Sequence, residues 1–243
     1  MGKKILLVGA SGAIGRRLTL LLRQSDHRVI GTTRSEAKAE GLRRLGMEAM
    51  VVDVFDAAAA SRALASAQPE VVINQLTDLP KDLDPASMKE AIVRNARVRE
   101  EGTRNLVAAA IEAGARRFIS QSIAWAYATG PEPHVESDPL DLSAEGDRAI
   151  TIGGVVALEN ATLKSPPLNG VVLRYGRLYG PGTSTDRPPE SAPLHVDAAA
   201  FAAFLAVDRG EPGAYNIVDT NAAVATDKAR EHLKWTPDFR INT

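Results

Sequence analysis

The chain has 243 residues, of which 44% are hydrophobic and 24% are charged, and its formal net charge is −1. This length and balance are those of one globular domain, and the near-zero charge gives no electrostatic basis for binding nucleic acid. The absence of cysteine excludes disulfides, thiolate catalysis and cysteine-bound metals. The apolar run near the start is too short to cross a bilayer and lacks the layout of a signal peptide, so we expect a cytoplasmic protein without a membrane partner.

Apolar runs of strand length alternate with helical patterns through the first half of the chain. In chain order the predicted strands are 5–8, 29–30, 49–52, 71–73 and 117–120, and the predicted helices are 13–22, 36–45, 57–67 and 86–113. Continuous apolar strands separated by helices are typical of a parallel sheet covered on both faces. The pattern therefore predicts an α/β protein with a Rossmann-type, doubly wound parallel sheet.

The second half of the chain is less regular. Residues 128–148 and 179–193 contain many prolines, glycines or acidic residues, and we interpret both segments as loops. Helices are expected at 151–163, 196–207 and 222–233, and strands at 170–174 and 214–218. We expect all of residues 1–243 to form a single domain.

A glycine-rich loop joins the first predicted strand to the first predicted helix. Glycine permits a tight turn and lets backbone N–H groups approach a pyrophosphate, which the start of the helix also attracts. The strand before the loop and the helix after it provide the context that such a motif requires, although a βα turn without a ligand is the alternative. We predict that the loop binds a dinucleotide through Gly9, Ser11, Gly12, Ala13, Ile14 and Gly15.

The spacing G-x-x-G-x-x-G resembles that of the short-chain dehydrogenase/reductase superfamily. Other segments resemble motifs of its extended branch, the NAD-dependent epimerase/dehydratase family, in the same order: Val52-Asp53-Val54, Gly102-Thr103-Arg104-Asn105-Leu106, Leu173 to Gly182, His195-Val196-Asp197 and Trp235-Thr236-Pro237. The resemblance covers nearly the whole chain in an atypical form. It implies an NAD(P)-binding oxidoreductase or epimerase-like enzyme, with Asp53 and Val54 against the adenine. Leu76, after the fourth strand, is assigned to the same cofactor site.

The end of the second predicted strand bears on the choice between NAD and NADP. An acidic residue there would accept hydrogen bonds from the ribose 2′-OH and repel a 2′-phosphate. Residues 31–35 contain no acid, whereas Arg34 offers a planar fork of donors and Ser35 a hydroxyl. The sequence predicts NADP(H), with NAD as a possibility. The alternative is that Arg34 is only a solvated surface residue.

The resemblance also implies a proton-transfer site, in which a serine or threonine follows the fifth strand and a tyrosine lies four residues before a lysine. Ser122 occupies the serine position and Tyr127 resembles a nearby family tyrosine, although the Ser122 hydroxyl could instead satisfy a backbone group. Aligning Glu159 with a family glutamate places Thr151 at the tyrosine and Val155 at the lysine. None of the four tyrosines has a lysine four residues later. The usual Tyr/Lys pair is missing, and the candidate catalytic residues are Ser122, Tyr127 and Thr151.

Other candidates for proton transfer are less specific. His134 lies in a polar loop and is interpreted first as a solvated residue. Tyr175 and Tyr179 are weaker candidates than Tyr127 and His134. His195 belongs to a motif that the family uses structurally, so we expect it to fix a turn. No His, Asp and Glu cluster has the spacing of metal ligands, and we predict no metal site.

The segment between Gly182 and His195 is shorter than in many members of the family, which predicts a small C-terminal substrate lobe, formed mainly from about 175–243. We therefore expect a small carbonyl or hydroxyl substrate and an NADP(H)-dependent oxidoreductase or epimerase-like activity. The alternatives are a catalytically silent NADP(H)-sensing protein and a lyase or cyclase that works without hydride transfer. The resemblance further implies a homodimer through the helices 86–113 and 151–163, unless their apolar residues all belong to the core.

Overall fold

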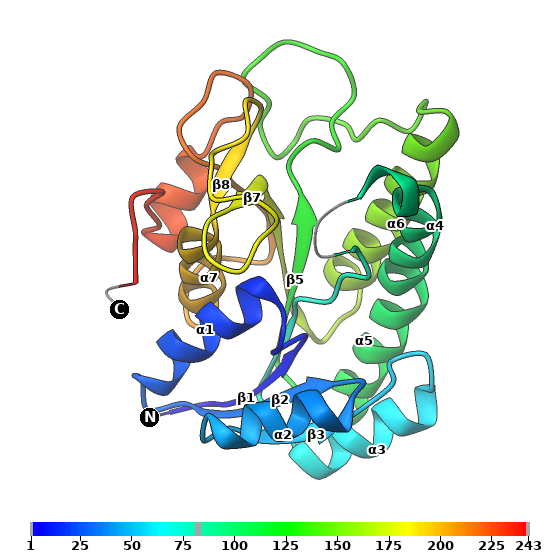
Figure 1. The fold of residues 1–243 in the computed structure, drawn as a ribbon, viewed down its shortest axis with the longest axis vertical. Helices are drawn as coiled ribbons and strands as arrows, with labels where there is room; N and C mark the ends of the chain where they lie inside the picture. Colours follow the sequence, from blue (N-terminus) through cyan, green and yellow to red (C-terminus); the bar gives the residue numbers. More distant parts are fainter. Residues whose placement is uncertain (1, 81–83, 242–243) are drawn as a thin grey trace.

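A seven-stranded sheet with helices on both faces organises the protein in a computed structural model, which describes residues 2–80 and 84–241 (Figure 1). The strand order is β3-β2-β1-β4-β5-β6-β9, and every neighbouring pair is parallel. The strands are β1 (Lys4–Val8), β2 (Arg28–Thr33), β3 (Glu48–Val51), β4 (Val71–Asn74), β5 (Arg117–Ile123), β6 (Asn169–Tyr175) and β9 (Gly213–Ile217). The prediction of a Rossmann-type, doubly wound sheet is confirmed.

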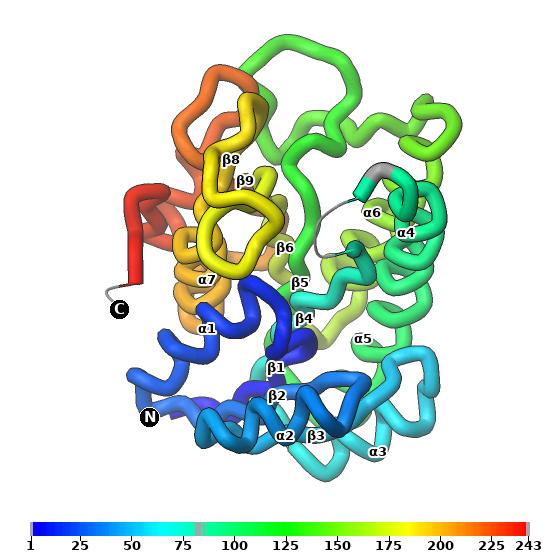
Figure 2. Tube along the Cα trace, viewed as in Figure 1, coloured from blue at the N-terminus to red at the C-terminus, as the bar shows by residue number. Residues whose placement is uncertain are grey.

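The helices divide between the two faces of the sheet. One face carries α1 (Ala13–Arg23), α2 (Glu36–Arg44) and α7 (Val196–Leu205), and the other carries α3 (Ala57–Ala67), α4 (Pro85–Arg97), α5 (Thr103–Glu112) and α6 (Gly146–Leu163). Helix α1, for example, packs on the sheet through one apolar face, in which the buried Ile14, Leu18 and Leu22 recur at one-turn spacing and form a single apolar stripe. Figure 2 shows α1 beside α7 and α4 beside α6, and both pairs are in contact.

Strand order reverses between β1 and β4. The chain moves outward from β1 to β2 and β3, and then returns to place β4 on the other side of β1. Crossover connections on opposite sides of the sheet leave a crevice at the carboxyl ends of these two strands, which is where such folds bind ligands. The glycine-rich loop at residues 9–15 and the segment after β4 therefore border the same crevice.

Several predicted boundaries shift in the structure. The long helix expected at 86–113 is interrupted by a π-helical turn, η1 (Val98–Gly102), between α4 and α5. Helix α6 begins at Gly146 rather than at residue 151, and its Arg148 donates hydrogen bonds to the backbone oxygens of Trp125 and Tyr127. A small parallel sheet of β7 (Arg177–Tyr179) and β8 (Pro193–His195) also brackets the loop expected at 179–193.

The helix predicted at 222–233 is wrong in its first half. Helical structure begins at residue 227 and continues as the π-helical turn η2 (Ala229–Leu233). The side chain of Asn221 accepts hydrogen bonds from the amides of Ala223 and Val224, and Val224 forms a β-bridge with His134. These long-range and side-chain bonds engage the backbone groups that a helix would have used.

Most of residues 175–241 pack against the main sheet. Strand β9 forms its edge, α7 lies against α1, and the indole of Trp235 donates to the backbone oxygen of Ala198 at 2.9 Å. The β7–β8 pair and the loop between its strands extend beyond this core (Figure 1). Within the described part of the chain, no helix has the length and apolar character needed to cross a membrane.

Candidate active site

The glycine-rich loop has two glycines that the fold itself requires. Gly9 has φ +85°, and a Cβ there would lie 2.8 Å from the backbone oxygen of Gln75. A Cβ on Gly15 would lie 2.8 Å from the backbone of Ala10. Gly12 differs, because its Cβ would meet only the Gly9 oxygen at 3.4 Å. The space beside Gly12 is therefore available to a ligand at the start of α1.

Replacing Gly12 by valine is expected to abolish dinucleotide binding while the fold persists. The added side chain occupies the space through which the backbone would approach a pyrophosphate, but it meets little of the protein. Valine at this N-cap position should lower the free energy of unfolding by only about 1 kcal/mol. Calorimetric titration with NADPH, together with thermal unfolding, provides the test. An unchanged dissociation constant would show that the loop is only a turn, and Gly15→Val serves as the contrasting variant that should damage the fold.

A pocket lies at the carboxyl ends of the first four strands. Its lining residues come from the ends of these strands, the segments that follow them and η1: Val8, Thr32, Thr33, Arg34, Val52, Val54, Phe55, Leu76, Thr77 and Val98. Three of the residues predicted to bind the cofactor, Arg34, Val54 and Leu76, thus line one pocket. Asp53 lies next to it, and its carboxylate accepts a hydrogen bond from the Phe55 amide at 3.0 Å, which fixes the turn after β3.

The Arg34 side chain lies at the rim of this pocket and makes few interactions with the described residues. Its side chain is 51% exposed, and its one ion pair among the described residues is a long contact of 3.7 Å with Asp78. Asp78 also lies 3.9 Å from Arg94, so it would keep a positive neighbour if Arg34 turned toward a ligand. Ser35 precedes α2, and its side chain makes no capping hydrogen bond. A guanidinium and a hydroxyl are therefore both available at the end of β2.

Ser122 and Tyr127 lie in one buried polar network. The Ser122 hydroxyl donates to Oε1 of Glu159 at 2.8 Å, and Arg174 donates to both oxygens of Glu159 at 3.0 and 2.7 Å. Arg174 also donates to the Tyr127 hydroxyl at 2.9 Å, and that hydroxyl donates to Oδ1 of Asn216 at 2.6 Å. All five side chains are buried. The network connects β5, α6, β6 and β9 with the loop after β5.

Electrostatics in this network do not favour proton transfer. Burial raises the pKa of Tyr127, and the adjacent Arg174 offsets this only in part. Burial alone would lower the pKa of Arg174, but its hydrogen bonds and ion pair with Glu159 outweigh that effect and raise it. A phenol with a raised pKa is a poor general acid near neutral pH. The geometry thus favours a structural use of both hydroxyls, and a catalytic role for Ser122 or Tyr127 stays a prediction.

Thr151 lies outside this network. Its hydroxyl donates to the backbone oxygen of Asp147, one turn earlier in α6, at 3.1 Å. Val155 is completely buried and packs with Ile123 and Ile152 in a small apolar cluster, which Trp125, Ala126, Leu140, Ala144 and Val156 complete. The place where the family resemblance expects a tyrosine and a lysine is therefore apolar, with one hydroxyl already bonded to its own helix.

His134 is not a solvated residue. Its ring stacks on Tyr127 with 4.8 Å between centroids, its Nδ1 lies 3.1 Å from Asp138, and its side chain is only 13% exposed. Tyr175 is also buried, where burial raises its pKa, and its hydroxyl lies 3.4 Å from the Gln75 amide. Both residues contribute to packing around the network.

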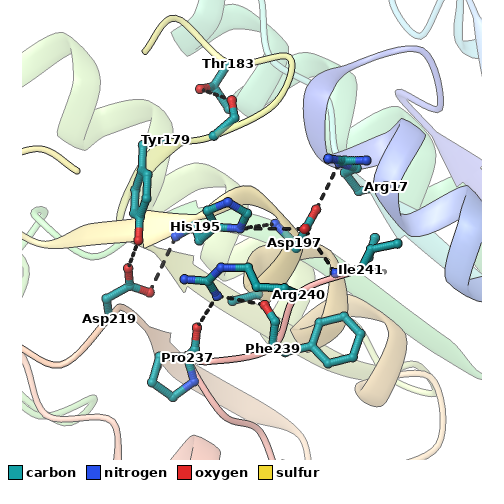
Figure 3. Close-up of polar contacts among 12 residues, drawn as sticks. Arg17, Tyr179, Thr183, His195, Asp197, Asp219, Pro237, Phe239, Arg240 and Ile241 are labelled. Atoms are coloured by element: carbon teal, nitrogen blue, oxygen red, sulfur yellow. Dashed lines mark hydrogen bonds and ion pairs between the residues drawn. The ribbon is translucent and has the colours of Figure 1, made fainter. Parts of the chain in front are cut away.

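A second polar cluster joins α1 to α7 and to the loops after β6 and β9 (Figure 3). His195 caps α7, because its Nδ1 accepts from the Asp197 amide at 3.2 Å, and Asp197 pairs with Arg17 of α1 at 2.9 Å. Tyr179 donates to Asp219 at 2.8 Å. Burial lowers the pKa of His195 and raises that of Tyr179. The cluster holds the start of α7 in place.

No group of three or more His, Asp or Glu side chains within residues 2–80 and 84–241 is arranged to hold a metal ion. The Glu159–Arg174 pair was not predicted, although the sequence contains a signal for it. Arg174 is the one charged residue of the predicted strand 170–174, and Glu159 is the one charged residue of the predicted helix 151–163. Buried charges need a partner, so two such residues on adjacent elements predict one another.

A doubly wound parallel sheet with a glycine-rich loop at its switch point defines a Rossmann-type dinucleotide-binding protein. The model of the NAD dependent epimerase/dehydratase family matches residues 5–206, and the chain belongs to this family. A protein from Streptomyces sp., named 3-diazoavenalumate denitrifying reductase, is 37% identical to it over 250 residues, which cover 97% of this chain and 80% of that protein. The family and this relative support an oxidoreductase or epimerase-like role with NAD(P).

Solved structures with the same fold include UDP-glucose 4-epimerase from Thermotoga maritima with UDP-glucose, at a TM-score of 0.80 and 18% identity over 97% of this chain and 94% of that one. The Bordetella bronchiseptica enzyme WbmG, in complex with NAD and UDP, matches with a TM-score of 0.73 and 16% identity over 99% and 91% of the two chains. At these identities the likeness shows the fold.

Proposed function

We propose that this protein is an NADP(H)-dependent reductase of a small molecule whose reduction needs a hydride but no proton from the enzyme. The observation that carries this proposal is the apolar cluster around Val155 and Ile152, in the place of the usual proton-transfer pair. Carbonyl reduction requires a proton on oxygen as well as a hydride on carbon. A site without a matched acid suits a different hydride acceptor.

A diazonium group is such an acceptor, and the name of the Streptomyces relative describes a diazo substrate and a denitrifying reduction. We infer that this chain acts on a small diazonium carboxylate. A C–N bond breaks and a C–H bond forms, so R–N2⁺ and NADPH give R–H, N2 and NADP⁺. Two electrons leave the nicotinamide and reduce the substrate, and no proton is consumed. This balance matches a site that lacks Tyr and Lys.

The chain's own residues would bind and protect the reactants. The residues fit NADP(H) at the glycine loop, where Gly12 leaves room for the pyrophosphate, and at the end of β2, where Arg34 and Ser35 would bind a 2′-phosphate. When bound, the reduced nicotinamide supplies the hydride. The apolar cluster at Val155 would exclude water, which otherwise attacks diazonium ions.

The test uses NADPH and 4-carboxybenzenediazonium as a simple probe. We expect oxidation of NADPH, release of N2 and formation of benzoate in equal amounts, with deuterium from 4-deuterated NADPH found on the ring. Gly12→Val is the matched control for the uncatalysed reaction. A rate equal to that control would contradict the proposal.

The earlier hypotheses give different results in the same assay. Reduction of a small ketone or oxidation of an alcohol would favour a carbonyl or hydroxyl substrate. Tight NADPH binding without turnover of either class would favour a sensing protein, for which the missing Tyr/Lys pair is the supporting observation. Conversion of a substrate without a net change in NADPH would favour a lyase, cyclase or epimerase.

Arg34→Ala is expected to weaken NADPH binding by about 1.5–3 kcal/mol, the worth of hydrogen bonds to a charged group, and to leave NADH binding nearly unchanged. The reason is the half-exposed guanidinium beside the free Ser35 hydroxyl. Calorimetry with both dinucleotides measures the difference. Arg94→Ala is the control, because it removes the other cation near Asp78. Equal wild-type affinities for NADPH and NADH would mean that NAD serves equally well.

We expect a homodimer formed through α4 and α6. Ile152, Val155 and Leu158 are buried within one chain, so they cannot contribute to such an interface. Exposed apolar side chains remain, with Val93 at 53%, Ile150 at 39% and Leu163 at 36%. Light scattering at micromolar concentration should give twice the mass of 25.9 kDa. A monomer mass would reject the dimer, and Val93→Glu with Ile150→Glu should produce that mass if the interface is correct.

A further inference from the structure

Arg99 is a buried arginine without a partner among residues 2–80 and 84–241. Its side chain lies in η1 and the residue is only 5% exposed, yet no hydrogen bond or ion pair joins it to another residue of the described chain. Arg174 is equally buried but makes four hydrogen bonds. Buried arginines are almost always paired, so an unpaired one requires a separate explanation.

Helical spacing places Arg99 beside the cofactor crevice. Asn95, Arg99 and Thr103 are each one turn apart, so they face the same direction. Asn95 accepts a hydrogen bond from a backbone amide of the segment after β4, and Thr103 accepts one from Asn74 at the end of β4. The preceding residue, Val98, lines the pocket at the ends of β1 to β4. Arg99 therefore lies near the carboxyl end of β4, next to the path of a bound dinucleotide.

The opposite wall near Arg99 is α6, which packs on η1. Burial lowers the pKa of Arg99 to about 10, and the charge of Glu159 opposes this shift. Arg99 is thus a cation at neutral pH. Glu159 already accepts three hydrogen bonds, from Ser122 and Arg174, and one carboxylate cannot balance two guanidinium groups. The interface between η1 and α6 therefore carries one positive charge in excess among these groups.

The nitrogens of the Arg99 guanidinium are not fully occluded from solvent. Fully occluded side-chain atoms that make no hydrogen bond, within the described ranges, belong to Gln75 and to the ion-paired Arg17 and Asp197, and none belongs to Arg99. Its nitrogens therefore retain some contact with solvent-filled space. A cation that is buried, unpaired and reachable is arranged to receive a ligand.

We propose that Arg99 binds the ribose attached to the nicotinamide, with its planar fork of donors directed to the vicinal hydroxyl oxygens. This inference rests on the proposed binding of NADP(H). The adenine half would fill the pocket beside Val98, and the other half must continue past β4 toward β5, where Arg99 faces α6. On helix α6, the position one turn before Glu159 is the completely buried Val155, which has no charge. The positive charge next to this part of α6 is therefore that of Arg99 in η1. Arg99 supplies charge and hydrogen bonds without taking part in proton transfer, because its pKa stays far above neutral pH.

Fragments of the cofactor locate the contact. On the full chain, calorimetry would compare 2′-phospho-ADP with 2′-phospho-ADP-ribose, which differ by the ribose in question. Arg99→Met is expected to weaken binding of the ribose-containing fragment and of NADPH by about 10-fold or more, and to leave 2′-phospho-ADP unchanged. Arg99→Lys should restore part of the loss. Equal weakening of both fragments, or no weakening of either, would overturn the assignment.

A stability measurement separates this role from a structural one. Without cofactor, Arg99→Met should unfold at a higher temperature than the wild type, because an unpaired buried charge is removed. The stabilisation that NADPH gives should be smaller in the variant. A lower unfolding temperature without cofactor would show that Arg99 supports the fold instead. If the wild type binds neither fragment, the proposed function itself fails, which is a different result from binding that Arg99→Met does not alter.

Discussion

Glu159→Ala is expected to lower the free energy of unfolding by about 3–5 kcal/mol, the usual effect of stranding one member of a buried ion pair. The change removes the two carboxylate oxygens that accept from the Arg174 guanidinium and the acceptor of the Ser122 hydroxyl. It also removes the carboxylate whose charge acts on Arg99. Urea unfolding monitored by tryptophan fluorescence provides the measurement.

A double variant is the control for this prediction. Glu159→Leu with Arg174→Met replaces both charges by apolar side chains of similar size, and we expect its stability to lie within about 1–2 kcal/mol of the wild type, because neither member of the pair is stranded and only the charge effect of Glu159 on Arg99 is lost. The Tyr127 hydroxyl would keep its bond to Asn216. If the single variant lost less than about 1 kcal/mol, Glu159 would not be essential to the network.

Reduction of ordinary ketones is expected to be slow or undetectable in the wild type, because the missing acid–base pair is worth about 10²–10⁴ in rate. On a true substrate, Ser122→Ala should reduce turnover more than Thr151→Ala, since the Ser122 hydroxyl belongs to the buried network around Glu159, whereas the Thr151 hydroxyl bonds only to its own helix. Steady-state rates with matched variants provide the comparison. Robust wild-type turnover that collapses on Thr151→Ala alone would overturn this assignment and make Thr151 a catalytic hydroxyl.

Restoring the pair tests the same point from the other side. Thr151→Tyr with Val155→Lys is expected to raise the rate of generic carbonyl reduction. The new lysine would be buried one turn before Glu159, on the helix that η1 contacts, and Arg99 would then be a like charge near it. No gain in this variant would show that the apolar cluster excludes the tyrosine from the reacting position.

The local signals in the sequence predicted the sheet and the glycine-rich loop, because strands such as 5–8 and glycines at fixed offsets encode their structure within a few neighbouring residues. The predicted cofactor residues Arg34, Val54 and Leu76 line a common pocket for the same reason, since each follows a strand of one parallel sheet.

The polar network could not be predicted in this way. Its members lie far apart in sequence, since Tyr127 and Asn216 are 89 positions apart, and only the tertiary fold brings them together. The error at 222–233 has the same origin, because the partner of Val224 is His134. The π-helical turn η1 could not be predicted either, because the helical periodicity of residues 86–113 continues through it without a local signal.

The loop between β5 and α6 has little regular secondary structure, yet many hydrogen bonds hold it. Arg148 donates to the backbone oxygens of Trp125 and Tyr127, and Arg174 donates to the backbone oxygen of Glu136. The amides of Ala128, His134 and Asp141 also donate to backbone oxygens, so these amide hydrogens should exchange with solvent deuterium about as slowly as those of the sheet, which sets the loop apart from the mobile flaps that cover many enzyme sites. The loop would act as a fixed wall. Ligand exchange would then not require this loop to open.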